Sequence, residues 1–321
     1  MKIQVGQNIR FLRHKRKVSQ EDLAETMGVT VQAISKWETG KANPDLALLP
    51  KLAEYFGVTI DYLFFVNQSE NTLSEDSALL LKQNSDWWAG ISETEMTPTA
   101  LPHYGFYTPK EDTLCLMGDV RGKVVLEIAC GSGESLVWMD RKGAKELWGL
   151  DISASHIKRA ELLLKKNGKL ANLFVSPMEV NPGLPHAYFD LVFSIYGIGW
   201  SMDLDKTIIH IADYLKPGGR LIFTWDNPLM QCIDSKNGQY VFSRSYVEEQ
   251  DIIIDNTFLL HNRKLSTYLN CLANHGFLIE QVVEEPDYDE KEADVFQEGK
   301  FYSAGRARLL NSAFIIRARK L

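Results

Sequence analysis

Residues 124–134 read VVLEIACGSGE, a short apolar run that ends in a glycine turn. A near-continuous apolar run of this length is typical of a strand that is buried on both faces of a parallel sheet. Gly131 and Gly133 lack a Cβ, so the backbone of the turn can take positive φ angles and can approach a ligand closely. The apolar pattern resumes at residues 136–139, which predicts a helix after the turn. Strand, glycine turn and helix together predict the opening of a nucleotide-binding βαβ unit.

The next predicted strand strengthens this interpretation. It is the run LWGLD at residues 147–151, and its terminal acid Asp151 follows Glu127 by 24 positions. An acid at the end of the second strand suits the ribose hydroxyls of an adenosyl ligand. A dehydrogenase would need a third glycine at the positions of Ser135 or Leu136 to complete its dinucleotide fingerprint. The pattern therefore disfavours a dehydrogenase.

Four motifs in this order resemble class I S-adenosylmethionine-dependent methyltransferases. They are VLEIACGSGE at 125–134, GLDIS at 149–153, FDLVFSIYG at 189–197 and LKPGGRLIF at 215–223. The resemblance extends over the chain from about residue 100 to its end. It implies S-adenosyl-L-methionine as the cofactor and an α/β Rossmann-like fold with a mostly parallel seven-stranded sheet. The last two strands of that sheet are expected at 276–283 and 312–319.

By this resemblance, residues from each motif contact the cofactor. The implied cofactor-binding residues are Tyr104, Tyr107, Glu127, Ala129, Gly131, Gly133, Asp151, Ile152, Ser176, Met178, Ser194 and Tyr196. The family usually has glycine where Ala129 stands, a departure that leaves backbone approach possible. It commonly has an acid near Ser176 to accept the adenine amino group, so this contact is weaker here or passes to the backbone around Met178. Tyr104 or Tyr107 would cover the methionyl end of the cofactor, unless the aromatic cluster around them joins a helix to the sheet.

The first 66 residues carry a helical pattern instead. Ile9 and Leu12 mark the apolar face of a first helix. Ser19 followed by Asp22 predicts a capped second helix that ends at Gly28. Three further helices are expected, after Thr30, at Pro44 and at Ile60. Two helices of this length joined by a glycine turn form a helix-turn-helix, so we expect an all-α five-helix domain.

Charge supports a nucleic-acid partner for this domain. The chain has a formal net charge of −7, yet its first 66 residues contain nine Lys or Arg and seven Asp or Glu. The basic residues are grouped at Arg10, Arg13, Lys15, Arg16 and Lys17. An acidic protein with one basic end can present that end to nucleic acid, although a short charged run is more often a solvated helix face.

The segment IRFLRHKRKVSQEDLAETMGVTVQAISKWETGKANPDLALLPKLAEYFGVTIDYL at 9–63 closely resembles the Xre family of phage-repressor-like and Cro-like DNA-binding domains. The resemblance implies a homodimer on a double-stranded DNA operator, with DNA-binding residues Gln20, Val31, Gln32, Ser35, Lys36 and Asn43. Glutamine can pair bidentately with adenine, and lysine can donate to guanine. Arg13 and Glu38 would form the family's internal ion pair. The alternative is a protein-interaction module.

These two resemblances divide the chain into three parts. They are a helix-turn-helix domain at 1–66, a linker at 67–85 and a methyltransferase domain at 86–321. The linker is rich in Ser, Asn and Glu and has at most a short helix at 78–82. Alternating apolar residues at 229–270 predict a β-rich insertion, where we expect substrate selectivity to reside.

Composition limits which classes of protein remain possible. The chain is 45% hydrophobic and 24% charged, which is ordinary for a globular protein. No apolar run approaches the roughly 20 residues that a membrane span requires, so we expect no membrane association. The four cysteines show neither a CxxC pair nor metal-ligand spacing. We therefore predict a cytoplasmic protein without a metal site.

The catalytic residue is not assigned by this reasoning. Methyl transfer from an activated sulfonium depends mainly on positioning, and a general base is needed only for an oxygen or a protonated nitrogen acceptor. His103 and His261 are the candidates for such a base. DNA is disfavoured as the acceptor, because residues 195–197 read IYG where the amino-methylating DNA enzymes carry an (Asp/Asn)-Pro-Pro-aromatic motif.

We predict a DNA-binding transcriptional regulator fused to a methyltransferase that acts on a small molecule. The alternative is a transcription factor whose Rossmann-like domain senses S-adenosylmethionine or another ligand without turnover.

Overall fold

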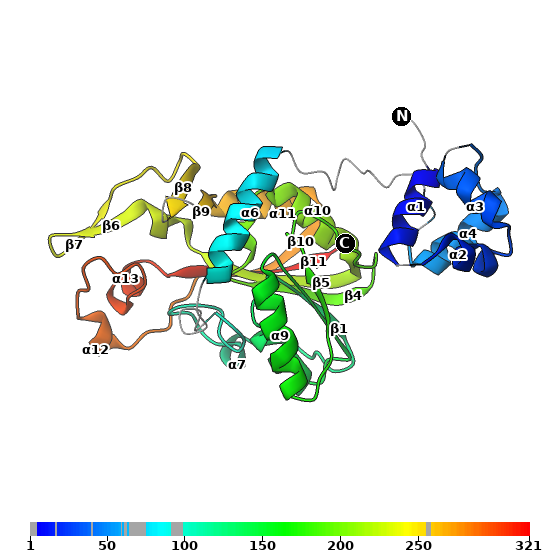
Figure 1. Ribbon diagram of the computed structural model, residues 1–321. Coiled ribbons are helices and arrows are strands. Elements are labelled where there is room, and N and C mark those ends of the chain that lie inside the picture. Colours follow the sequence, from blue (N-terminus) through cyan, green and yellow to red (C-terminus); the bar gives the residue numbers. More distant parts are fainter. Residues whose placement is uncertain are drawn as a thin grey trace. The chain divides into compact units, whose positions relative to one another are not determined.

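Figure 1 shows the protein as a computed structural model. The structure describes residues 5–16, 18–39, 41–58, 60, 63, 75–90, 99–254 and 258–321. The chain divides into two units. The first contains Met1–Thr72 together with Gly183–His186, and the second contains Leu73–Pro182 and Ala187–Leu321.

The described part of the first unit is helical. Its elements are α1 (Val5–Lys15), α2 (Gln20–Met27), α3 (Val31–Glu38), the 3-10 turn η1 (Leu46–Leu48) and α4 (Leu49–Phe56). Ile9, Leu23, Ile34 and Leu52 are fully buried in one core that all four α-helices share. The fourth helical segment begins at Leu46 rather than at Pro44. The fifth helix expected at 60–65 lies largely outside the described residues.

Local capping explains why these helices begin and end where they do. Ser19 Oγ accepts from the Asp22 N–H at 3.0 Å, and the Asp22 carboxylate accepts from the Ser19 N–H at 3.0 Å, so the predicted capping box is present. Gly28 has a φ of 73°, which ends α2 in the left-handed conformation that glycine tolerates best. Thr30 caps α3 through its side chain. The helix-turn-helix is therefore encoded by neighbouring residues.

The second unit is built on a seven-stranded sheet with the order β10-β11-β5-β4-β1-β2-β3. The strands are β1 (Val124–Ile128), β2 (Glu146–Asp151), β3 (Asn172–Val175), β4 (Phe189–Ile195), β5 (Leu215–Asp226), β10 (Phe277–Val283) and β11 (Ala313–Lys320). Every pairing among the strands β1 to β5 is parallel, whereas β11 runs antiparallel to both of its neighbours. The predicted Rossmann-like, mostly parallel sheet is confirmed.

Helices cover both faces of this sheet. Helix α9 (Ala154–Lys166) lies on one face, and α10 (Leu204–Tyr214) and α11 (Leu265–Asn274) lie on the other (Figure 1). Helix α8 (Glu134–Arg141) follows the glycine turn directly, as predicted. In a parallel sheet of this kind, ligands bind outside the carboxyl ends of the strands.

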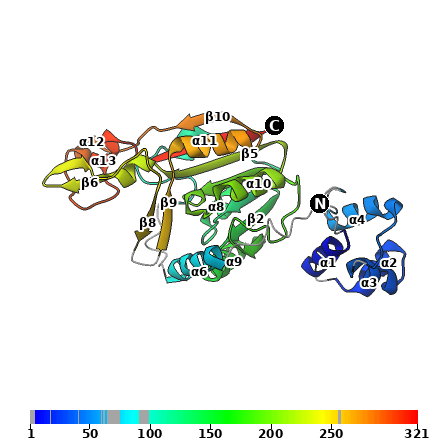
Figure 2. The ribbon, with the colours of Figure 1, turned by 90° about the horizontal axis from the view of Figure 1, so that it is seen from above.

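Helix α6 (Glu75–Gly90) differs from the expected short helix at 78–82. It packs against α9 and against β9 (Phe258–Asn262), and it runs beside α9 in the second view (Figure 2). The Asn84 amide accepts from the Leu259 N–H at 3.3 Å and donates to the Leu259 carbonyl at 3.4 Å. Residues 75–85 of the expected linker therefore belong to the second unit. Their polar composition hides the few apolar positions, such as Leu81, that anchor the helix.

The region 229–270 contains two antiparallel hairpins, which confirms the predicted β-rich insertion. One pairs β6 (Ile233–Lys236) with β7 (Gln239–Phe242), and the other pairs β8 (Gln250–Ile254) with β9. Short helices α12 (Glu290–Ala293) and α13 (Ala304–Leu309) follow β10. None of the described helices is long and apolar enough to cross a membrane.

Candidate functional site

The glycine turn after β1 is hydrogen-bonded to the end of β2. Ala129, Gly131 and Gly133 have φ values of 56°, 51° and 83°. This left-handed path turns the Gly131 N–H toward Asp151, whose Oδ2 accepts from it at 2.9 Å. The other carboxylate oxygen of Asp151 accepts from the Ser153 N–H at 2.8 Å. Asp151 is thereby held in one orientation at the carboxyl edge of the sheet.

A cavity of about 310 Å³ opens at this edge. Residues of α6, the β1 turn, the ends of β2 and β4 and the C-terminal segment line it together. Eight of the predicted cofactor-binding residues are in this lining: Glu127, Ala129, Gly131, Asp151, Ile152, Ser176, Met178 and Tyr196. The structure therefore brings residues from three separate motifs into one space.

Four other predicted residues do not line the cavity. A Cβ at Gly133 would lie 3.0 Å from the Ala160 Cβ, so Gly133 permits close packing of the turn on α9. Ser194 is fully buried. Tyr104 is also fully buried and donates to Glu111 at 2.5 Å, while Tyr107 donates to Glu292 at 2.8 Å.

Phe106, which stands between the two tyrosines, lines the cavity instead. The sequence marked this segment as an aromatic cluster but did not show which of its rings faces the ligand.

The two candidate bases lie outside the cavity lining. Burial, reinforced by Lys110, lowers the pKa of His103. His261 pairs with Asp251 across the β8–β9 hairpin. His156 on α9 lines the cavity instead, with Nδ1 3.4 Å from Asp151 and Nε2 buried without a hydrogen-bond partner among the described residues. Sequence reasoning missed His156 because a lone histidine in a helix carries no motif.

Tryptophan side chains form one wall of the cavity. The rings of Trp87 and Trp88 on α6 meet edge to face at 5.0 Å, and Trp88 meets Trp200 at 5.4 Å. Trp200 in turn contacts Trp225 at 4.9 Å. The backbone at Gly199 lies against the Trp225 ring so closely that a Cβ there would be 1.7 Å from it. Aromatic rings packed on one another therefore form an apolar wall of the cavity.

The predicted DNA-binding residues of the first unit lie in two environments. Gln32 and Lys36 on α3 and Asn43 in the following loop are exposed. Val31 and Ser35 are half-buried.

Gln20 donates from Nε2 to Glu38 at 2.7 Å. Glu38 also pairs with Arg13 at 2.6 Å, which is the predicted internal ion pair. Glu38 therefore anchors Gln20 at the start of α2.

Comparisons with known proteins agree with this division. Residues 9–63 match the family model described as helix-turn-helix, and residues 126–223 match the one described as methyltransferase domain. The chain is 39% identical over 62 residues to an uncharacterized HTH-type transcriptional regulator of Methanocaldococcus jannaschii, covering 19% of this chain and 94% of the relative. It is 32% identical over 143 residues to a putative protein N5-glutamine methyltransferase of that organism, covering 36% of this chain and 70% of the relative.

The chain belongs to both families. It joins a helix-turn-helix regulator domain to a methyltransferase domain. The fold agrees with a solved S-adenosylmethionine-dependent methyltransferase from Mesorhizobium loti, at a TM-score of 0.55 and 22% identity over 65% of this chain and 96% of the other. The protein is a methyltransferase, and S-adenosylmethionine is the cofactor of its family.

The charges around the methyltransferase cavity fit this cofactor, which carries a sulfonium and an ammonium. The acids Glu127, Glu134, Asp151 and Glu179 line the cavity, and none of its lining residues in the described part of the chain is Lys or Arg. Glu127 Oε2 is buried without a hydrogen-bond partner among the described residues, and burial raises the pKa of this carboxyl well above its usual range. A bound ammonium would satisfy that oxygen and favour its ionised form. The residues present therefore fit the group.

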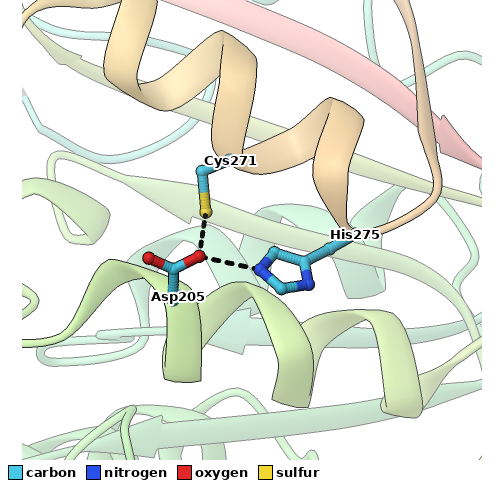
Figure 3. Close-up of side chains that lie close together, drawn as sticks. All are labelled: Asp205, Cys271 and His275. Atoms are coloured by element: carbon cyan, nitrogen blue, oxygen red, sulfur yellow. Dashed lines mark hydrogen bonds and ion pairs between the residues drawn. The ribbon is translucent and has the colours of Figure 1, made fainter.

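A second cluster joins α10 to α11 in the methyltransferase domain (Figure 3). Asp205, Cys271 and His275 each place one potential ligand atom within 4.8 Å of the others. Asp205 Oδ1 lies 2.8 Å from His275 Nε2 and 3.7 Å from Cys271 Sγ. Burial, reinforced by Asp205, raises the pKa of Cys271 to about 12, so this group is a thiol donor. Hydrogen bonds thus account for the cluster, and the lack of a metal site stays a prediction.

Proposed function

We propose that the second unit transfers the methyl group of S-adenosylmethionine to a small molecule held in the cavity. We also propose that the first unit binds operator DNA as a homodimer. One observation supports the enzymatic half most directly: Glu127 lines the cavity, and its buried Oε2 has no hydrogen-bond partner in the described part of the chain.

The size and enclosure of the cavity support a small acceptor. Its volume of about 310 Å³ is that of a small-ligand pocket, and tryptophan rings close one side. Lining residues from α6, the end of β4 and Tyr302 would place an acceptor beside the cofactor-binding turn. Positioning of this kind supplies most of the acceleration for transfer from an activated donor.

Exposure of Gln32 and Lys36 supports the DNA-binding half. Side chains four positions apart on one helix face can reach adjacent bases in the major groove. One recognition helix reads only half a site, so a dimer would protect two half-sites about one helical turn apart. Footprinting on selected DNA tests this, and a single unpaired half-site would contradict it.

Calorimetry tests the enzymatic half. S-adenosylmethionine should bind the full chain at about micromolar affinity, near −8 kcal/mol. Asp151→Ala should weaken binding by about 1–3 kcal/mol, because hydrogen bonds to a charged group are lost. Asp140→Ala is the matched control, since Asp140 on α8 pairs with Lys169 and does not line the cavity. Equal affinities of the two variants would remove Asp151 from the site.

The fused DNA-binding unit favours one second candidate, a ligand sensor without turnover. Formation of S-adenosylhomocysteine in the presence of acceptor extracts separates the two functions. A sensor would bind the cofactor, change its operator affinity and release no product.

A further inference from the structure

Asp226 is a buried carboxylate behind the cavity that the functions above leave without a role. It ends β5, is 7% exposed and is not among the cavity-lining residues. Tyr302 donates its hydroxyl to Asp226 Oδ1 at 2.8 Å and itself lines the cavity. A buried carboxylate without a paired cation is costly, so its retention beside a ligand cavity points to chemistry.

A second tyrosine stands beside this pair. Tyr196 lines the cavity with its ring centroid 6.4 Å from that of Tyr302. Its hydroxyl is buried without a hydrogen-bond partner among the described residues. Its φ of 53° is a left-handed conformation that residues other than glycine rarely adopt, and such strain concentrates at functional sites.

Packing holds both tyrosine rings in place. Phe106 stacks on Tyr302 at 4.1 Å with an interplanar angle of 15°. The Gly105 backbone approaches Tyr196 so closely that a Cβ at Gly105 would lie 2.0 Å from the ring. The two hydroxyls are therefore held in fixed positions before any ligand arrives, which is what selective recognition of a small polar group requires.

We propose that Tyr196 and Tyr302 bind the hydroxyl group of an uncharged, phenol-like methyl acceptor, and that Asp226 receives its proton through Tyr302. This inference rests on the methyl transfer proposed above. The Tyr302 proton is engaged by Asp226, so its oxygen is left to accept from the ligand hydroxyl. The Tyr196 hydroxyl lies beside Asp226 and Tyr302, which both act on its pKa, and it would donate to the ligand oxygen once the acceptor occupies the cavity. The aromatic wall receives the ring, and the lack of Lys and Arg among the described lining residues disfavours an anionic acceptor.

The proton transfers balance with methyl transfer. The ligand hydroxyl gives its proton to the Tyr302 oxygen as Tyr302 gives its own proton to Asp226. The cofactor supplies the methyl group, so that a carbon–oxygen bond forms and the carbon–sulfur bond breaks with its electron pair left on sulfur. Asp226 ends protonated and returns the proton to solvent when the product leaves.

The surroundings of Asp226 match this role. Burial raises its pKa to about 7, while Tyr302, Tyr196 and the more distant guanidinium of Arg306 act in the opposite direction. Among the described residues, Tyr268 on α11 is a further titratable group close to Asp226. The carboxylate form needed to take a proton therefore predominates above about pH 7, and turnover per bound acceptor should rise through that pH.

Binding of three probes of similar size tests the inference without activity. Phenol, benzylamine and benzoate are titrated calorimetrically into the full chain saturated with S-adenosylhomocysteine. Phenol should bind at least about tenfold more tightly than either charged probe, and Tyr302→Phe should weaken phenol by about tenfold, a loss of about 1.4 kcal/mol. Tyr240→Phe is the matched control, since its hydroxyl contacts Ser303 and it does not line the cavity.

Each outcome is decisive. Equal phenol affinity in Tyr302→Phe and Tyr240→Phe, or benzoate binding as tightly as phenol, would overturn the inference while S-adenosylhomocysteine binding upholds the proposed function. If the wild-type chain does not bind S-adenosylhomocysteine, both the inference and the proposed function are overturned. Asp226→Asn should keep cofactor affinity and remove the rise of turnover through pH 7, and an unchanged pH profile would exclude Asp226 from the proton path.

Discussion

In the first unit, Gln32 and Lys36 lie four positions apart on one helix and face solvent, held there by a core of neighbouring helices. In the second unit, Leu81 on α6 and Tyr302 near the C-terminus line the same cavity. The first surface depends on helical periodicity, and the second depends on elements that converge at one sheet edge. Substitutions should therefore act locally in the first unit and across the fold in the second.

The largest effect is expected from the removal of Glu38, because this buried carboxylate holds both Arg13 and Gln20. Glu38→Ala leaves the buried Arg13 guanidinium without its carboxylate, which costs about 3–5 kcal/mol. Thermal unfolding should show the first unit melting early while the second still binds S-adenosylmethionine. Glu54→Ala on α4 is the exposed control. If the two variants unfold alike, the buried pair does not support this unit.

The next largest effect is expected in the second unit, where the backbone that follows β4 passes close to the turn after β1. A Cβ at Gly197 would lie 2.5 Å from the Ala129 Cβ and 2.5 Å from Ser194 Oγ. Gly197→Ala should destabilise the second unit by about 3 kcal/mol through overpacking and also weaken cofactor binding. Adding Ala129→Gly should restore part of both, because it removes one contact and relieves the φ of 56°. Chemical denaturation measures the first effect and calorimetry the second.

Gly90→Ala is the control for this pair, since nothing lies within 4 Å of a Cβ there. No rescue by Ala129→Gly would show that the turn and β4 do not share the strain.

A smaller effect separates base reading from positioning in the first unit. Gln32→Ala should cost about 1–3 kcal/mol at the base pair it reads and relax the preference there. Gln20→Ala should weaken all sequences alike, because we propose that Gln20 contacts a phosphate rather than a base. Binding-site selection at one fixed salt concentration distinguishes them. Identical preference profiles for the two variants would contradict the assignment.

The smallest expected effect is the pH dependence of cofactor binding. Burial raises the pKa of Glu127, and a bound ammonium would lower it again, so binding should release a proton at pH values between the two. Affinity should then fall about tenfold per pH unit, or about 1.4 kcal/mol, as pH drops through that window. Calorimetry in buffers of different ionisation enthalpy counts the proton. Glu127→Gln should abolish the release, and proton release that persists in this variant would assign it to another acid.

The two units also differ in how well their helices and turns could be predicted from the sequence. The capping box at Ser19 and the turns at Gly28 and Gly131 involve residues a few positions apart, so their short-range signals predicted the elements correctly. The short helix expected at 78–82 is longer, Glu75–Gly90, because most of α6 is polar and only a few apolar side chains, such as Leu81, mark it as a packed helix. Periodicity alone does not predict which neighbouring element a helix with few apolar residues will pack against.

The sequence by itself determined the two folds, their order and the strand-end acids Glu127 and Asp151. Each of these follows from apolar runs, glycine turns and spacing along a continuous chain. Only the tertiary structure decided that Phe106 rather than Tyr104 or Tyr107 faces the cavity, that His156 lies beside Asp151, and that Tyr302 reaches Asp226. These contacts join residues from different elements, and the packing of helices and strands selects among side chains that the sequence leaves equivalent.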